Sequence, residues 1–160
     1  MNRFVTSLVV LGLGLMAMPT PSALQPQEAR VILISIDGLM PSSYTSPALD
    51  AQTPNLRRLA RAGVWADGVI GVLPTVTYPS HTTLITGVEP ARHGIYDNQI
   101  LDPEGRSNNA WYWYANAIKV PTLPMAARAR GLRAAAVTWP VTIGMDLDVN
   151  APEYIGSKHE

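Results

Sequence analysis

The sequence predicts an α/β fold, in which helices cross over between the strands of a mostly parallel sheet and cover both of its faces. Two continuous apolar runs, residues 30–36 and 132–139, are typical of strands buried on both sides. Three segments between them carry the start and stop signals of helices. The resulting order of strand, helix, helix, helix and strand is that of α/β crossover units.

The strands are identified by their β-branched and apolar residues. Arg30–Ile36 is the first, and it ends directly before an Asp-Gly pair. Residues 64–72 are a candidate for a second strand, which two glycines interrupt. Leu132–Trp139 is the last, and its apolar composition again predicts a buried position.

Each expected helix has Thr or Pro near its start and Gly directly after its end. Thr53 is the expected N-cap of the first helix, with Pro54 at the first helical position, and Thr122 is the expected N-cap of the third. The stretch Asp102–Asn109 is rich in Gly, Pro and Asn and is the best candidate for a loop. The expected helices are Thr53–Gly63, Pro79–Thr86 and Thr122–Arg130.

The N-terminal residues have the layout of a secretory signal. Arg3 provides the positive start, Phe4–Met18 is the apolar run, and a segment of small and polar residues follows. The apolar run is shorter than the roughly 20 residues that span a bilayer. We therefore expect a signal peptide at residues 1–23 and a secreted or periplasmic protein. An uncleaved membrane anchor is the alternative interpretation.

The composition excludes several classes of protein. Lys and Arg total 12, Asp and Glu total 12, and the formal net charge is zero, so the basic excess of a protein that binds nucleic-acid duplexes is absent. Without cysteine, the chain has no disulfide scaffold, no thiolate zinc finger and no Cys nucleophile. The composition does not define an oligomeric state.

Asp37 follows the first expected strand directly. Ligands of open α/β sheets bind outside the carboxyl ends of the strands. A carboxylate at this place is able to bind a divalent cation or to orient a nucleophile. A turn formed with Gly38 is an equally good interpretation of the pattern.

Hydroxyl groups are crowded around Thr77, at the start of an expected helix. A helix start attracts phosphate or sulfate because its backbone N–H groups are unpaired and the helix dipole is positive there. A Thr hydroxyl becomes a nucleophile only beside a base or a metal ion. From the pattern alone, ordinary N-capping by Thr77 or Ser80 is the favoured interpretation.

Other residues that suggest chemistry have a simpler structural interpretation. For His81 and His93, which lack an i, i+4 partner, a structural hydrogen bond is favoured, and His159 is expected in solvent. The aromatic run Trp111–Tyr114 is typical of core packing rather than of ligand stacking. Asp146–Asn150 begins like a calcium loop, but the Gly and the closing Glu of an EF-hand are missing.

Four segments together resemble the type I phosphodiesterase/nucleotide pyrophosphatase family of the alkaline phosphatase superfamily. Their order and spacing cover most of residues 30–98, which makes the resemblance specific. A fifth segment, Lys119–Val141, resembles the next helix–strand unit of the family. The four segments are VILISIDGLMPS (Val31–Ser42), TPNLRRLARAG (Thr53–Gly63), PTVTYPSHTTLITG (Pro74–Gly87) and PARHGIYDN (Pro90–Asn98).

The resemblance implies roles for three residues. Asp37 matches the first metal-binding Asp, Thr77 matches the nucleophile that also contacts a metal ion, and Asn98 matches the donor to a phosphate oxygen. The family chemistry uses two divalent metal ions, with zinc preferred, and proceeds through a phospho-threonine. The implied substrate is a small-molecule phosphodiester or nucleotide.

The sequence also departs from the family pattern. Val76 stands where many relatives have Lys, and Ser80 stands where many have Asn. The segment starting at Thr77 is also similar to the sulfatase pattern Cys/Ser-x-Pro-x-Arg, with His81 in place of the Arg. Because threonine cannot form the formylglycine of sulfatases, a sulfatase is the weaker interpretation.

The C-terminal metal ligands of the family, of the types Asp-x-x-x-His and Asp-His-Gly, do not occur in the sequence. We therefore expect residues 24–160 to be the N-terminal part of an alkaline-phosphatase-like domain whose C-terminal part is missing. The isolated chain is then expected to be inactive, although it belongs to an exported metal-dependent phosphodiesterase. The alternatives are a non-catalytic truncated product and a related phosphatase or sulfatase-like hydrolase.

Overall fold

The computed structural model describes residues 30–49, 52–106 and 110–153. The chain divides into two units, Met1–Ile34 and Ser35–Glu160, and the second contains all the helices and strands of the described residues. The predicted signal peptide and its boundary after residue 23 lie outside the described residues, as does His159, so these remain predictions. No helix within the described ranges is long and apolar enough to cross a membrane.

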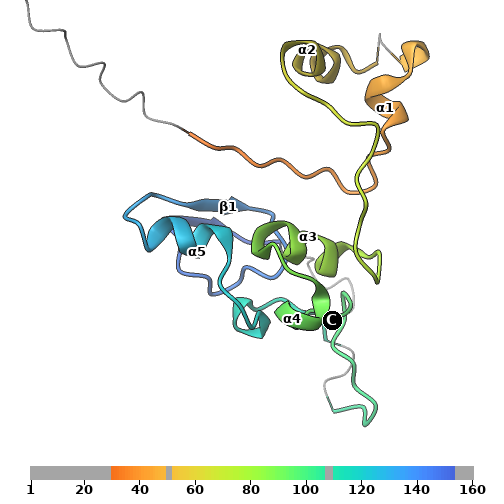
Figure 1. Cartoon of the computed structure of the whole chain (residues 1–160). Coiled ribbons are helices and arrows are strands. Elements are labelled where there is room, and N and C mark those ends of the chain that lie inside the picture. The colour runs from red at the N-terminus through yellow and green to blue at the C-terminus, as the bar shows by residue number, and fades with distance from the viewer. Residues whose placement is uncertain (1–29, 50–51, 107–109, 154–160) are drawn as a thin grey trace, which may run out of the picture. The chain divides into compact units, whose positions relative to one another are not determined.

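The described residues form a mixed structure of helices and two short strands (Figure 1). Helix α3 contacts both α4 and α5, and α1 contacts α2. The helices are α1 (Ser42–Thr45), α2 (Pro54–Ala62), α3 (Thr77–Thr86), α4 (Pro90–His93) and α5 (Leu123–Arg128), with 3-10 turns at Pro47–Leu49 and Ala115–Ala117.

The sheet consists of β1 (Ala135–Val137) and β2 (Val149–Ala151) within the part of the chain that the structure describes. The two strands are parallel, with Ala136 opposite Asn150. The parallel pairing agrees with the predicted α/β class. The larger sheet with helices on both faces remains a prediction.

The strands predicted at residues 30–36 and 64–72 are not formed, and the last predicted strand is not fully buried. Arg30–Ile36 forms no strand and is exposed, with exposed fractions of 89% for Val31 and 76% for Ile34. Residues 64–72 are likewise exposed and irregular. The last expected strand is reduced to β1 and is only partly buried. A continuous apolar run is stable as a strand only between neighbouring strands, and among the described residues none pairs with residues 30–36 or 64–72.

The helix signals were more accurate. Helix α2 begins after Thr53, although the Thr53 hydroxyl donates to the Ser43 carbonyl (2.9 Å) and does not cap the helix. Helix α5 begins after Thr122, whose hydroxyl accepts a hydrogen bond from the Met125 N–H as expected of an N-cap. That helix ends at Arg128, two residues before the expected end.

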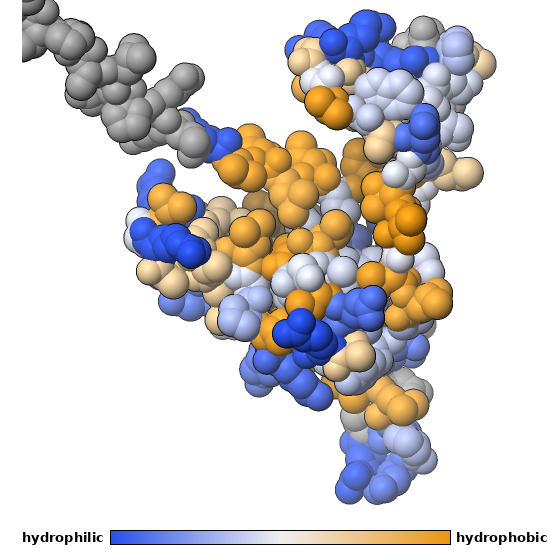
Figure 2. Space-filling view, viewed as in Figure 1, coloured by the Kyte–Doolittle hydropathy of each residue, from blue (hydrophilic) through white to orange (hydrophobic). Residues whose placement is uncertain are grey.

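The core lies between α3 and the segments that follow α4. Its fully buried centre is formed by Tyr78, Ile95 and Val141. Residues from the aromatic run pack around this centre, which confirms the predicted core role of Trp111, Tyr112 and Trp113. For Tyr114, which is 58% exposed, the prediction was wrong. Many apolar side chains nevertheless lie at the surface, as Figure 2 shows.

Candidate functional site

Asp37 lies in a tight turn. The Leu39 N–H donates to the Ile36 carbonyl (3.2 Å), and Gly38 has a φ of +70°, in the left-handed region that glycine adopts without strain. The turn with Gly38 is therefore present, and it leaves the Asp37 carboxylate available. Asp37 Oδ2 accepts a hydrogen bond from Thr77 Oγ1 at 2.9 Å.

Thr77 is the first residue of α3, two positions before the expected start. The N-cap residue is Val76, which has an extended backbone and no side-chain hydrogen bond to the helix. The interpretation of Thr77 or Ser80 as the N-cap was therefore wrong. Because Thr77 does not cap the helix, its hydroxyl is able to meet the Asp37 carboxylate. At the other end, Gly87 has a φ of +68° and terminates the helix as predicted.

Asn98 contacts the start of α3. Its Oδ1 accepts a hydrogen bond from the Tyr78 backbone N–H at 2.8 Å, so this side chain caps the helix from 20 residues away. The backbone of Asn98 is also held, because its carbonyl accepts from Tyr112 N–H (3.0 Å) and its N–H donates to the Asp97 carboxylate (2.6 Å). With Oδ1 occupied, the amide donates through Nδ2.

The three residues that the sequence predicts for the site are thus brought to one place. Asp37 is bound to Thr77, and Asn98 is bound to the next residue, Tyr78. The dipole of α3 favours an anion at this helix start, although the Tyr78 N–H is already bound to Asn98 and Pro79 has no N–H. The start of α3 is thus contacted by a carboxylate at Thr77 and by an amide at Tyr78.

The oxygen donors of this site meet only part of the needs of a metal ion. Asp37 and Thr77 provide two oxygens within hydrogen-bond distance of each other, which suits a shared divalent cation. A catalytic zinc ion needs about three protein ligands. Among the described residues, no three side chains of His, Cys, Asp or Glu form a group able to hold a metal ion. Asp37 and Thr77 alone therefore do not complete a catalytic zinc site.

Tyr78 anchors the start of α3, a role that the sequence reasoning missed. Its ring is 1% exposed and meets the rings of Trp111 and Trp113 edge-on, with centroid distances of 5.4 and 6.2 Å. Burial raises the pKa of the phenol, and the carboxylate of Glu153 raises it further. The only signal in the sequence was an aromatic residue placed between Thr77 and Pro79.

The two described histidines form structural hydrogen bonds, as predicted. His81 is bound to the Thr77 carbonyl through Nδ1. His93 is fully buried, and its Nδ1 accepts from Ile95 N–H (3.1 Å), so its proton is on Nε2, which donates to Thr83 Oγ1 (3.1 Å). Burial lowers the pKa of His93.

The segment that begins like a calcium loop has a structural role. Arg128 pairs with Asp148 (2.9 Å) and with Asp146 (3.3 Å), which links the end of α5 to the approach to β2. Asp148 also accepts a hydrogen bond from Ala134 N–H (2.8 Å), and this bond, followed by Arg128, lowers the pKa of the carboxyl group.

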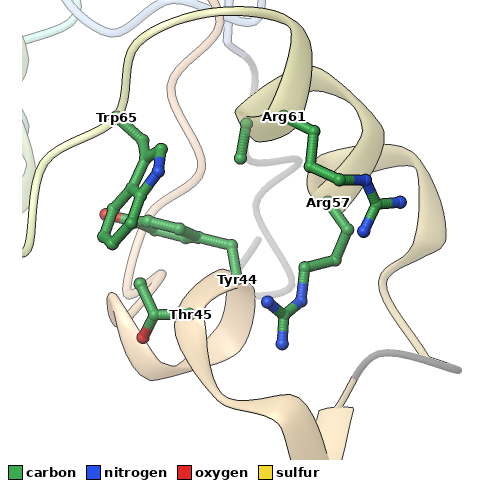
Figure 3. Close-up of a pocket in the computed structure, with 6 residues that line it drawn as sticks. Tyr44, Thr45, Arg57, Arg61 and Trp65 are labelled. Atoms are coloured by element: carbon green, nitrogen blue, oxygen red, sulfur yellow. The ribbon is translucent and has the colours of Figure 1, made fainter.

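A small cavity between α1 and α2 contains none of the predicted site residues (Figure 3). Its volume of about 110 Å³ is below the roughly 300 Å³ of ordinary ligand pockets. It is therefore too small to be the substrate pocket. It is lined by Tyr44, Thr45, Arg57, Ala60, Arg61 and Trp65.

Comparison with known proteins connects this site to a family. The chain is 33% identical over 130 residues to mouse ectonucleotide pyrophosphatase/phosphodiesterase family member 3, an alignment that covers 75% of this chain and 14% of that protein. It is 36% identical over 97 residues to human family member 5 (60% and 19%). It is 29% identical over 133 residues to venom phosphodiesterase 2 of Crotalus adamanteus (78% and 15%).

The alignments thus span less than a fifth of each of these relatives. The family profile described as type I phosphodiesterase/nucleotide pyrophosphatase matches residues 31–158, which is most of the chain and includes every predicted site residue. The chain therefore belongs to the type I phosphodiesterase/nucleotide pyrophosphatase family.

Proposed function

We propose that this chain carries the nucleophile of an exported, metal-dependent hydrolase of phosphodiesters or nucleotide pyrophosphate bonds. The observation that carries the proposal is the hydrogen bond from Thr77 Oγ1 to Asp37 Oδ2 at the N-terminus of α3. Family membership supports the reaction class. The names of relatives, which include an ectonucleotide pyrophosphatase and a venom phosphodiesterase, support nucleotides as substrates and an extracellular location.

In the proposed reaction, Thr77 Oγ attacks phosphorus in line. A bond forms between Oγ and phosphorus while the bond from phosphorus to the leaving oxygen breaks, which leaves a phospho-threonine that water then hydrolyses. The Asp37 carboxylate holds the Thr77 hydroxyl in place and accepts its hydrogen bond. The hydroxyl proton is lost to water as the bond to phosphorus forms, and the leaving oxygen takes up a proton from water. When bound, two divalent metal ions, preferably zinc, would lower the pKa of the hydroxyl and neutralise charge on the phosphoryl group.

Asn98 has the role of a donor to the phosphoryl group. Its Oδ1 is held by the Tyr78 N–H, so its Nδ2 is the part of the amide that is left to donate. A donor that is fixed before the reaction stabilises negative charge without having to reorganise. The N-terminus of α3 adds to this effect at the same position.

We further propose that the 160-residue chain does not turn over substrate alone. Two metal ions require more ligands than Asp37 and Thr77 supply. The described residues contain no group of three His, Cys, Asp or Glu side chains that could hold a metal ion. The nucleotide sequence after the codon for Glu160 tests this proposal. An in-frame continuation with Asp-x-x-x-His and Asp-His-Gly segments supports the enzyme, whereas a stop codon at that place supports a non-catalytic product.

The nucleophile is tested in a longer protein in which this chain is followed by the Asp-x-x-x-His and Asp-His-Gly segments. Hydrolysis of p-nitrophenyl nucleotide esters with zinc is expected to be lost in Thr77→Ala and retained in Thr86→Ala. The second variant is a matched control, because the Thr86 hydroxyl lies in the same helix and donates to the Thr82 carbonyl. Wild-type turnover in Thr77→Ala would show that Thr77 is not the nucleophile.

A further inference from the structure

The peptide group between Thr77 and Tyr78 is held at both ends by side chains. Its carbonyl oxygen, which belongs to Thr77, lies 2.8 Å from Nδ1 of His81. Its N–H, which belongs to Tyr78, donates to Asn98 Oδ1 at 2.8 Å. Two side chains from different segments therefore fix the plane of the peptide that follows the proposed nucleophile.

The contact with the Thr77 carbonyl determines that Nδ1 of His81 carries a proton. A carbonyl oxygen only accepts hydrogen bonds, so Nδ1 carries a proton and donates it to Thr77 O. His81 lies one helical turn after Thr77, and side chains in a helix point back toward its N-terminus, which brings the ring to this carbonyl. The residue is 9% exposed, so little water reaches the bond.

Trp139 supports the His81 ring from outside the helix. The two rings meet edge to face, with centroids 5.3 Å apart and an interplanar angle of 76°. Trp139 belongs to the turn after β1, in which Thr138 (φ 51°) and Val141 (φ 57°) have left-handed backbones. For a β-branched residue this is a strained conformation that persists only where the surroundings impose it. Val141 is buried in the core with Tyr78, and this burial holds the turn in place.

These contacts have a consequence for Thr77. The Thr77 carbonyl is attached to the Cα that carries the hydroxyl, so fraying of the first turn of α3 would move Thr77 Oγ1 away from Asp37. We propose that His81 is a positioning residue, which holds this peptide with its Nδ1–H so that Thr77 Oγ1 stays 2.9 Å from the carboxylate. The inference rests on the proposed function, because it assigns His81 a role in the reaction of Thr77.

Three substitutions at His81 separate positioning from packing. Asparagine places an amide donor the same number of bonds from Cβ as Nδ1, so His81→Asn is able to restore the bond to Thr77 O. Glutamine places its donor one bond farther away, and phenylalanine retains the ring against Trp139 but has no donor. A purely structural role predicts instead that activity follows the stability of each variant.

The test measures kcat, KM and thermal stability in the same longer protein that carries the Asp-x-x-x-His and Asp-His-Gly segments. His81→Phe and His81→Gln are expected to lower kcat on the order of 10- to 100-fold with KM changed less than about twofold, because a small misplacement of a reacting group has costs of this size. His81→Asn is expected to recover most of kcat. Wild-type kcat in His81→Phe, or no recovery in His81→Asn at matched stability, overturns the proposal.

Two controls make the outcomes distinguishable. His93→Asn alters the other described buried histidine, whose hydrogen bonds to Thr83, Ile95 and the Pro79 backbone do not include the Thr77 carbonyl, so it should lower stability with kcat retained. Thr77→Ala is measured in the same assay. If that variant keeps its turnover, the proposed function fails, whereas loss in Thr77→Ala with full kcat in His81→Phe overturns the positioning role alone.

A measurement on the unsubstituted protein keeps the inference testable if the variants do not fold. Nitrogen-15 NMR of the imidazole rings assigns the proton of each ring nitrogen. A protonated Nδ1 of His81 is expected, since it donates to Thr77 O. An unprotonated Nδ1 overturns the proposal.

Discussion

Thr77 Oγ1 donates a hydrogen bond of 2.9 Å to Asp37 Oδ2, although 40 residues separate the two positions in the chain. One residue follows an exposed apolar run, and the other opens a helix. At this contact the role of the carboxylate charge can be tested by itself. An uncharged isostere keeps the hydrogen bond and loses only the charge.

Asp37→Asn is therefore expected to leave folding almost unchanged and to remove most of the turnover. The amide oxygen still accepts from Thr77, but the negative charge that would bind a cation is lost. A decrease in kcat of about 10²- to 10³-fold is expected, the range for losing one preorganised electrostatic group. Zinc content by mass spectrometry should decrease as well. Asp146→Asn changes another exposed carboxylate and should leave both quantities as in wild type.

Two substitutions at Asn98 separate its acceptor from its donor. Asn98→Ala leaves the Tyr78 N–H without its partner and is expected to cost about 1–3 kcal/mol of unfolding free energy in urea titrations. Asn98→Asp retains an oxygen for that N–H, so stability should be largely kept while turnover falls, because the donor Nδ2 is gone. Equal turnover in Asn98→Asp and wild type would contradict the donor role.

The sequence was informative where the structure depends on local chemistry. Thr122 capped its helix and Gly87 ended another, because caps act through the backbone of adjacent residues. The motif residues Asp37, Thr77 and Asn98 were identified through the family resemblance, and the structure places them together. The N-cap at Val76 was not predictable from the pattern, because an apolar residue gives no capping signal.

Long-range pairing was not predictable from the pattern of apolar residues. Arg30–Ile36 has the composition of a buried strand, but a strand exists only when a neighbour accepts its hydrogen bonds. The capping of Tyr78 by Asn98 also depends on a contact between distant segments. Similarly, the contact between the rings of His81 and Trp139 depends on the turn after β1, whose conformation cannot be predicted from local sequence patterns.

Stability is expected to depend on pH through His93. Burial lowers the pKa of this ring in the folded chain, so near neutral pH the unfolded chain binds more protons than the folded one. The contribution of His93 to stability is present above its unfolded-state pKa of about 6.5 and is lost as the pH falls below this value. The free energy of unfolding then changes by at most about 1.4 kcal/mol per pH unit. Urea titrations at pH 7.5 and 5.0 measure the difference. His93→Asn should reduce it, and an unchanged difference would show that His93 does not contribute.

The exposed apolar run before Asp37 predicts self-association of the isolated 160-residue chain. Val31 and Ile34 are 89% and 76% exposed, and a β-branched run of low charge is the composition that pairs edge to edge between chains. Ile34→Lys is expected to reduce light scattering at micromolar concentration, because a charge in the run opposes such pairing. Leu123→Lys, at an exposed apolar position of α5, is the matched control and should change scattering little. Equal effects of Ile34→Lys and Leu123→Lys on scattering would refute association through this run.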